Sequence, residues 1–390
     1  MTESTRTSAL ASRHLALGSD LEDWNGMGTA WSYSSDPCYE HDAVRNAAGL
    51  FDMSGLKKIH VKGKDAEAVV DYIITRDMTQ IVPGQSAYGP ILTDEGMIAD
   101  DAIIANMGGN EYIVVHGGGS TMELLEETAK GKDVTCEFDD DLHDISLQGP
   151  KALELLDAHT PMDLSSLKYF HQKKTKLFGH SCIISRTGYS GERGYEIFAV
   201  ADVVCDLWDK ILEHGKEIGV MPCSFTALDK VRIEAALLFY GYDMSEENTP
   251  WEVTLGWSVS ARKGDFRGKE AVLAAKGREK VNLVGISIDH DDMLAGGEKL
   301  LLDGKEVGSV LSPGYSHRMK KSLALVHVIP EAAKAGTNLT VKGDDVNYAA
   351  LIERTPFYDP EKNSYPSINS SSSSNRPGVI HKGGWIDIMG

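Results

Sequence analysis

Two adjacent aspartates, Asp100 and Asp101, stand inside an otherwise apolar segment of this chain. Aspartate is disfavoured in strand interiors, and consecutive strand residues point to opposite faces, so we expect one of the two side chains to point inward. A carboxylate buried in this way is costly unless another group pairs with it. The pair therefore indicates either a solvated strand end or a carboxylate that handles charge in a site.

A glycine-rich segment, residues 186–196, is the second candidate for chemistry. Its three glycines permit backbone conformations and close approaches that other residues forbid. No GKS or GKT follows them, so a phosphate-binding loop is only weakly indicated. The segment closes with Glu196 at the head of an apolar strand, an unusual place for a charge without a partner. It fits a β-hairpin or a binding site.

A third group of charged residues comprises Asp229, Arg232 and Glu234, and aromatic segments follow it at 240–244 and 249–257. At helical spacing the three charges could be surface ion pairs, which contribute little stability. They could equally belong to a site. The sequence pattern leaves both interpretations open.

The elements that must position these residues change in character along the chain. Residues 1–40 look like an irregular arm, and residues 64–75 have the apolar spacing of an amphipathic helix. Segment 86–107 is predicted to form two strands with a turn at Gly96. Further helices are predicted at 121–130, 203–215 and 224–238, and beyond about residue 280 only short strands and turns follow. This order predicts helices on antiparallel sheets, an α+β class, followed by an all-β module.

Composition narrows the classes of function. Among 390 residues, 58 are acidic and 39 are basic, which gives a net charge of −19. This charge disfavours nucleic acids and anionic membranes as partners. The five scattered cysteines show neither metal-ligand nor redox spacing, and no apolar run has the length of a signal peptide core or a membrane span. We expect a cytoplasmic protein without a metal site.

Taken together, these motifs resemble the aminomethyltransferase (glycine-cleavage T-protein) family, which includes folate-dependent demethylases. The resemblance runs from about Phe51 to Tyr358. The matching stretches are 51–54, 96–101, 147–150, 186–196, 232–235, 240–244, 249–250 and 268–271. A single such match is weak, but eight in register are specific.

The resemblance implies a three-domain fold around a central folate channel, with a C-terminal β-barrel-like domain. The expected first domain comprises 1–53 and 143–244, and the second comprises 54–142 and 245–279. The barrel is expected at 280–360 and a flexible tail at 361–390. The resemblance also implies tetrahydrofolate as cofactor. It assigns catalysis to Asp101 and cofactor binding to Tyr88, His116, Tyr189, Glu196 and Arg232.

The identity of the one-carbon donor is less constrained, because the sequence departs from the family where donor and folate would lie. The family's Ser-His-Met is Ser54-Gly55-Leu56 here, and its folate loop, usually rich in asparagine, reads Val115 to Gly119. We therefore expect a tetrahydrofolate-dependent methyltransferase (demethylase) that moves a methyl group from a small N-, S- or O-methyl substrate to N5. The alternatives are a T-protein acting on a lipoyl carrier protein and a non-catalytic folate-binding protein. Candidate substrate contacts are Trp31, Tyr240, Trp251 and Trp257, and Trp24 is a further tryptophan that could face a methylated cation or lie in the core.

Overall fold

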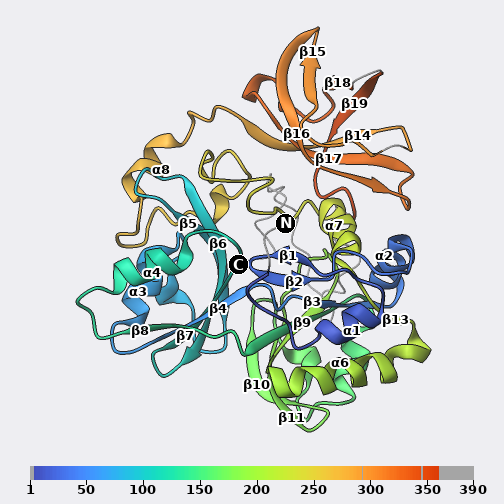
Figure 1. Ribbon diagram of the computed structural model, residues 1–390. Coiled ribbons are helices and arrows are strands. Elements are labelled where there is room, and N and C mark those ends of the chain that lie inside the picture. The colour runs from blue at the N-terminus through green and yellow to red at the C-terminus, as the bar shows by residue number, and fades with distance from the viewer. Residues whose placement is uncertain (1–3, 292, 344–345, 360–390) are drawn as a thin grey trace, which may run out of the picture.

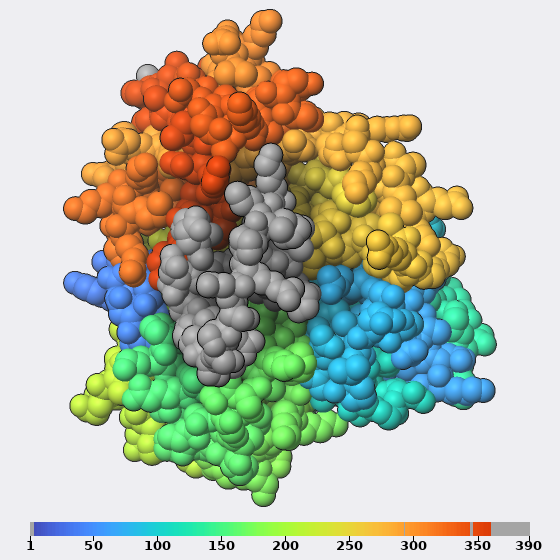
Figure 2. Space-filling view, turned by 180° about the vertical axis from the view of Figure 1, so that it is seen from behind, coloured from blue at the N-terminus to red at the C-terminus, as the bar shows by residue number. Residues whose placement is uncertain are grey.

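The computed structural model describes residues 4–291, 293–343 and 346–359. Figure 1 shows three lobes, each built on its own sheet, with the barrel above two mixed lobes. The same three lobes are visible from behind in Figure 2, where residues of the barrel lie over those of both mixed lobes. The predicted tail at 361–390 lies outside the described residues.

The first lobe is a six-stranded sheet in which only β13 and β3 pair in parallel. In spatial order its strands are β10 (Gln172–Leu177), β11 (His180–Ser185), β12 (Gly194–Val200), β9 (Leu142–Gln148), β3 (Ala48–Asp52) and β13 (Val220–Pro222). Its helices are α2 (Pro37–Asn46), α5 (Ala152–Asp157), α6 (Ala201–Gly215) and α7 (Phe225–Glu234). Helix α6 buries Val204, Leu207, Trp208 and Ile211, whose helical spacing forms one apolar stripe that faces the core.

The second lobe is an antiparallel five-stranded sheet covered by two helices. Its strands, in spatial order, are β5 (Ser86–Leu92), β6 (Ile98–Gly108), β7 (Glu111–His116), β4 (Lys57–Lys62) and β8 (Thr135–Phe138). Helices α3 (Ala66–Ile73) and α4 (Thr121–Ala129) pack on one face, and α8 (Lys269–Ala275) lies nearby in Figure 1. The opposite face of this sheet is not covered by these two helices.

The third lobe is a closed barrel of six strands. Its order is β14 (Asn282–Ile288), β17 (Lys321–Val328), β16 (Lys305–Ser316), β15 (Lys299–Leu302), β18 (Asn338–Lys342) and β19 (Asn347–Glu353). The predicted change to an all-β module near residue 280 is confirmed. The domain division expected from the sequence remains a proposal.

Two local predictions were wrong. The N-terminal arm is ordered: it contains α1 (Ala11–Ala16) and a hairpin of β1 (Glu22–Trp24) and β2 (Met27–Thr29). The helix expected at 224–238 ends at Glu234 instead, because Ala236 adopts a left-handed conformation with φ of 54°. The segment after α7 is therefore free to turn towards the second lobe. No helix within the described ranges is long and apolar enough to cross a membrane.

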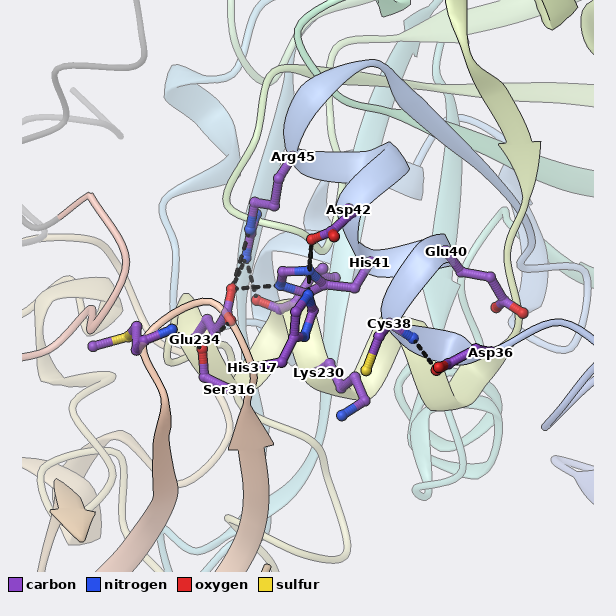
Figure 3. Close-up of polar contacts among 12 residues, drawn as sticks. Asp36, Cys38, Glu40, His41, Asp42, Arg45, Lys230, Glu234, Ser316 and His317 are labelled. Atoms are coloured by element: carbon purple, nitrogen blue, oxygen red, sulfur yellow. Dashed lines mark hydrogen bonds and ion pairs between the residues drawn. The ribbon is translucent and has the colours of Figure 1, made fainter. Parts of the chain in front are cut away.

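A buried ionic network joins the first lobe to the barrel (Figure 3). The Glu234 carboxylate accepts hydrogen bonds from Arg45 at 2.8 Å, from His41 Nε2 at 2.9 Å and from the barrel's Ser316 hydroxyl at 2.6 Å. Burial by itself raises the pKa of Glu234, but the hydrogen bond from His41 and the charge of Arg45 outweigh it and lower the pKa to about 2. Glu234 therefore stays ionised and ties the two lobes together.

Two histidines extend this junction through Asp42. His317 Nε2 lies 2.8 Å and His41 Nδ1 lies 3.2 Å from the same Asp42 carboxylate oxygen. The three side chains are close enough to share a cation, since their ligand atoms lie within 4.8 Å of one another. Their hydrogen bonds already account for this closeness, so we interpret the group as part of the interlobe network.

Replacing Glu234 by Gln tests the network. The substitution removes the negative charge and leaves the buried Arg45 with Glu192, at 3.1 Å, as its remaining counter-ion, so we expect a loss of about 3 kcal/mol in the free energy of unfolding. Urea unfolding of Glu234→Gln and of the control Glu306→Gln measures it. Glu306 pairs with Lys299 on the surface, where both side chains are 56% exposed, and its removal should cost less than about 1 kcal/mol. Equal losses in the two variants would contradict the role of Glu234.

Candidate functional site

A cavity of about 350 Å³ lies between the two mixed lobes. Its walls come from β5, β6 and β7 of the second sheet, from β10 to β12 of the first sheet, from the N-terminal hairpin and from the segment after α7. Most of the lining is apolar or aromatic. The few polar groups in it are therefore informative about the ligand.

Strand β6 decides which of the two adjacent aspartates enters the cavity. Asp101 lines the cavity, whereas the fully buried Asp100 points to the opposite face. There the Asp100 carboxylate accepts hydrogen bonds from His116 Nδ1 at 2.8 Å and from the Thr121 hydroxyl at 2.5 Å. Asp100 thus anchors the start of α4, and Asp101 is the group available for chemistry.

The same geometry restricts the predicted role of His116. His116 is one of the lining residues, and its buried imidazole binds Asp100 through Nδ1 while Nε2 has no hydrogen-bond partner among the described residues. His116 pairs with Ala102 across the ladder, and Ala102 shares its face with Asp100 and not with Asp101. The Asp100 hydrogen bond occupies Nδ1 only, so the prediction that His116 binds the cofactor stays a prediction.

Asp101 is held by one hydrogen bond and is poised to exchange a proton. Its Oδ2 accepts the hydroxyl of Tyr88 at 2.9 Å, and among the described residues Oδ1 has no hydrogen-bond partner. Burial, followed by the nearby charge of Asp100, raises the pKa of Asp101 to about 7. A carboxylate with this pKa can take up or release a proton near neutral pH.

Glu196 is the second carboxylate that reaches the cavity. It lies on β12, and its Oε2 accepts the hydroxyl of Thr187, while within the described ranges Oε1 has no hydrogen-bond partner. Burial raises the pKa of Glu196, and the Thr187 hydrogen bond opposes that shift. The unpaired oxygen is an acceptor directed at a ligand that carries donors.

Aromatic rings form much of the remaining wall. Tyr88 and Trp257 stack with their ring centroids 6.4 Å apart, and Tyr189 is fixed by a hydrogen bond from its hydroxyl to the Leu238 carbonyl at 2.5 Å. Tyr240 also lines the cavity. The structure therefore gathers around one cavity eight residues that the sequence singled out: Trp24, Tyr88, Asp101, His116, Tyr189, Glu196, Tyr240 and Trp257.

Three predicted site residues lie outside the lining. Arg232 is buried in ion pairs with Asp229 and Asp243, both at 2.6 Å, so its guanidinium stabilises the loop after α7 and does not line the cavity. Trp31 packs on the ring of Phe225 at 5.4 Å, and Trp251 donates its indole N–H to the Val272 carbonyl. Within the described structure Arg232, Trp31 and Trp251 do not line the cavity, and their roles in binding remain predictions.

Sequence reasoning named Trp24 but left its place between site and core open, and it missed other lining residues, including Tyr169 and Thr187 as the partner of Glu196. Trp24 directly precedes Asn25-Gly26, a dipeptide typical of a tight hairpin turn. That signal could have shown the arm to be an ordered hairpin. It could not have shown where the hairpin docks.

Comparisons with known proteins agree with this architecture. A family model of the GCVT N-terminal domain matches residues 10–263, and one of the glycine cleavage T-protein C-terminal barrel domain matches residues 282–359. The crystal structure of glycine cleavage system aminomethyltransferase T from Bartonella henselae superposes with a TM-score of 0.84 at 26% identity, covering 90% of this chain and 98% of that chain.

Two curated relatives differ in their described activities. The chain is 47% identical over 371 residues to the heme-dependent oxidative N-demethylase gamma subunit of Ectopseudomonas mendocina (strain ymp), covering 93% of this chain and 98% of that protein. It is 34% identical over 346 residues to an aminomethyltransferase of Desulfitobacterium hafniense (strain Y51), covering 87% of this chain and 94% of that protein.

The raised pKa of Asp101 predicts a pH-dependent stability. Between the ordinary pKa of 3.8 and the folded value of about 7, the folded protein retains a proton that the unfolded chain has released. Asp101 therefore costs stability progressively as the pH rises through this window. Asp101→Asn cannot ionise, so it should be more stable than the wild type at about pH 8 by a few kcal/mol. At about pH 5 this advantage of the variant should be smaller.

Thermal unfolding at both pH values measures this difference. The exposed Asp303→Asn is the control, and its difference from the wild type should not change with pH. A pH-independent effect of Asp101→Asn would show that Asp101 ionises normally in the folded protein.

Proposed function

This chain belongs to the glycine-cleavage T-protein family, and we propose that it transfers a one-carbon unit from a small amine-derived donor to tetrahydrofolate. The observation that carries the proposal is a pair of carboxylates, the half-buried Asp101 and the buried Glu196, which face one aromatic cavity from two different sheets. The family and the barrel-bearing fold expected from the sequence are confirmed. The reaction and the residue roles are our proposal.

The donor set of the cavity fits tetrahydrofolate. The pterin edge presents an amino group and a ring N–H side by side, and one carboxylate can accept both. Glu196 offers such a carboxylate, with Oε1 unpaired among the described residues and Oε2 sharing only the Thr187 hydroxyl. Tyr88 and Tyr189 supply flat walls. We assign Glu196 to the pterin edge and the two tyrosines to its faces.

Asp101 would manage the charge of the transfer. Tetrahydrofolate supplies the nucleophilic nitrogen that takes up the carbon. Asp101 accepts the proton that this nitrogen gives up, and its pKa of about 7 matches that task at neutral pH. Tyr88 holds the carboxylate in place through its hydrogen bond to Oδ2. The apolar lining excludes water, which strengthens the electrostatic effect of the carboxylate.

Similarity to the N-demethylase subunit guides the choice of donor. The sequence led us to expect an intact methyl group, but an amine is a poor leaving group from an unactivated methyl carbon. Oxidation of an N-methyl group places its carbon at the formaldehyde level, where it is electrophilic without further activation. We therefore propose that this carbon arrives already oxidised and leaves as 5,10-methylene-tetrahydrofolate, while the amine and a proton are released. No electrons are exchanged in this step, so a separate oxidation must supply the donor.

The aminomethyltransferase relatives support a second candidate, transfer of an aminomethyl group from a lipoyl carrier protein. Release of ammonia from a lipoylated carrier would favour this candidate. Formation of 5-methyl-tetrahydrofolate from a methylated compound would favour the intact methyl transfer. A mass spectrum of the folate product with each donor separates the three reactions.

Glu196→Ala should weaken tetrahydrofolate binding, because the pterin donors would lose their acceptor. The expected loss is about 1–3 kcal/mol, which corresponds to roughly 5- to 150-fold in Kd. Calorimetric titration measures it. The control is Glu137→Ala, which changes an exposed glutamate on β8. An unchanged affinity in Glu196→Ala would remove Glu196 from the site.

Asp101→Asn should bind tetrahydrofolate yet transfer carbon slowly. After the spontaneous reaction with formaldehyde is subtracted, the transfer rate of the variant should be about 10²- to 10⁴-fold lower than that of the wild type. This is the range found for a positioned proton acceptor. In the wild type, kcat/KM should rise with pH through about 7, as Asp101 ionises. The pH profile and the rate of methylene-tetrahydrofolate formation measure both effects. A fully active Asp101→Asn enzyme would refute the proposed role.

A further inference from the structure

The N-terminal hairpin is built into the wall of the cavity. Its turn at Asn25 and Gly26 has positive φ at both residues, 54° and 80°, which is the backbone of a tight hairpin turn. Trp24 and Asn25 both line the cavity. An arm that precedes the first lobe in sequence thus contributes directly to the site.

Glycines in the second lobe make room for this hairpin. A Cβ atom on Gly55 would overlap the ring of Trp24, and one on Gly118 would lie 2.9 Å from Asn25 Oδ1. Larger residues at these positions would therefore displace the hairpin. The departures from the family pattern at Ser54-Gly55-Leu56 and in the loop ending at Gly119 thus have a common structural consequence.

Arg6 fixes the hairpin against Gly55 and Gly118. Its guanidinium donates to the carbonyls of Asn25 and Gly55, both at 3.1 Å, and to the Ser54 carbonyl at 3.3 Å. Three backbone carbonyls on two chain segments are bound by one side chain. The position of Trp24 in the wall is therefore specified by the fold.

Trp24 belongs to an aromatic corner of the cavity. Its ring meets Phe225 edge to face with centroids 4.8 Å apart, and the ring of Phe239 lies 6.3 Å away. All three residues line the cavity. Such a cluster presents electron-rich faces that attract a cation, and tryptophan does so most strongly.

The charge of the lining favours the same kind of ligand. The lining contains the carboxylates of Asp101 and Glu196 and, as far as the described residues extend, neither lysine nor arginine. Arg232 lies on the ring of Phe239, 5.8 Å from its centroid, but Asp229 and Asp243 neutralise its charge outside the cavity. An anionic donor would meet no counter-charge in the cavity, whereas a cationic donor would meet two carboxylates.

We propose that Trp24, Phe225 and Phe239 form the donor subsite and that the donor enters as a small N-methylene ammonium (iminium) cation. This inference rests on the proposed function, because it names the class of donor for the same cavity. Trp24 is the specificity-determining residue. Gly55 and Arg6 are positioning residues that place its ring.

Ligand-observed NMR titration with tetramethylammonium, and with tert-butanol as a smaller neutral probe, tests the subsite. The wild type should bind the cation more tightly than the neutral probe. Trp24→Leu should weaken cation binding by roughly 3- to 30-fold, Trp24→Phe should weaken it less, and neither should change tert-butanol binding as much. Trp251→Leu, which removes a tryptophan outside the lining, should bind the cation like the wild type.

Gly55→Ala tests the packing surface under Trp24 without changing the Trp24 side chain itself. Its added methyl should displace Trp24 and reproduce the Trp24→Leu loss, with circular dichroism confirming that the variant is folded. Equal cation binding in wild type and Trp24→Leu, or a preference for tert-butanol, would overturn the subsite.

Tetrahydrofolate titration of the same variants separates this failure from failure of the proposed function. If the Trp24 variants still bind tetrahydrofolate and only the cation data disagree, the donor subsite is wrong and the transferase proposal stands. If the wild type binds no tetrahydrofolate, the proposed function fails, together with the inference that rests on it.

Discussion

Two carboxylates held away from water in one cavity are the constraint on which this structure depends. Asp101 reaches the cavity from β6 of one sheet and Glu196 from β12 of another, and burial raises the pKa of both. Neither is neutralised by a basic side chain within the described lining. Such an arrangement costs stability in the empty protein, and a ligand that brings hydrogen-bond donors or positive charge recovers it.

Basic residues near the site are used elsewhere, which keeps the cavity negative. Arg232 is neutralised by Asp229 and Asp243, and Arg45 is bound to Glu234 in the junction with the barrel. These pairs fix the loop after α7 and the barrel relative to the first lobe. Arg232 and Arg45 therefore stabilise the contacts between segments of the fold, and neither offers its positive charge to a ligand in the cavity.

Close approach of the N-terminal hairpin gives a structural reason for glycine at two positions near the proposed donor subsite. Gly55 and Gly118 lack the Cβ atoms that would exclude Trp24 and Asn25. The substituted positions and the added aromatic wall therefore form one structural unit. A change of donor within a conserved fold needs such paired changes, because a bulky side chain can enter a packed site only where its neighbours become smaller.

Sequence alone determined the classes of the elements, the change to an all-β module near residue 280 and the expectation that one of two adjacent aspartates points inward. Those features follow from local periodicity and from the alternation of side chains along a strand. Tertiary structure decided that both are enclosed, Asp100 against His116 and Asp101 facing the cavity, and that Arg232, Trp31 and Trp251 lie outside the cavity lining. It also brought Trp24 into the wall. These outcomes depend on partners distant in the chain, such as Ser312 for Arg232 and Gly55 for Trp24, and a local pattern carries no record of such contacts.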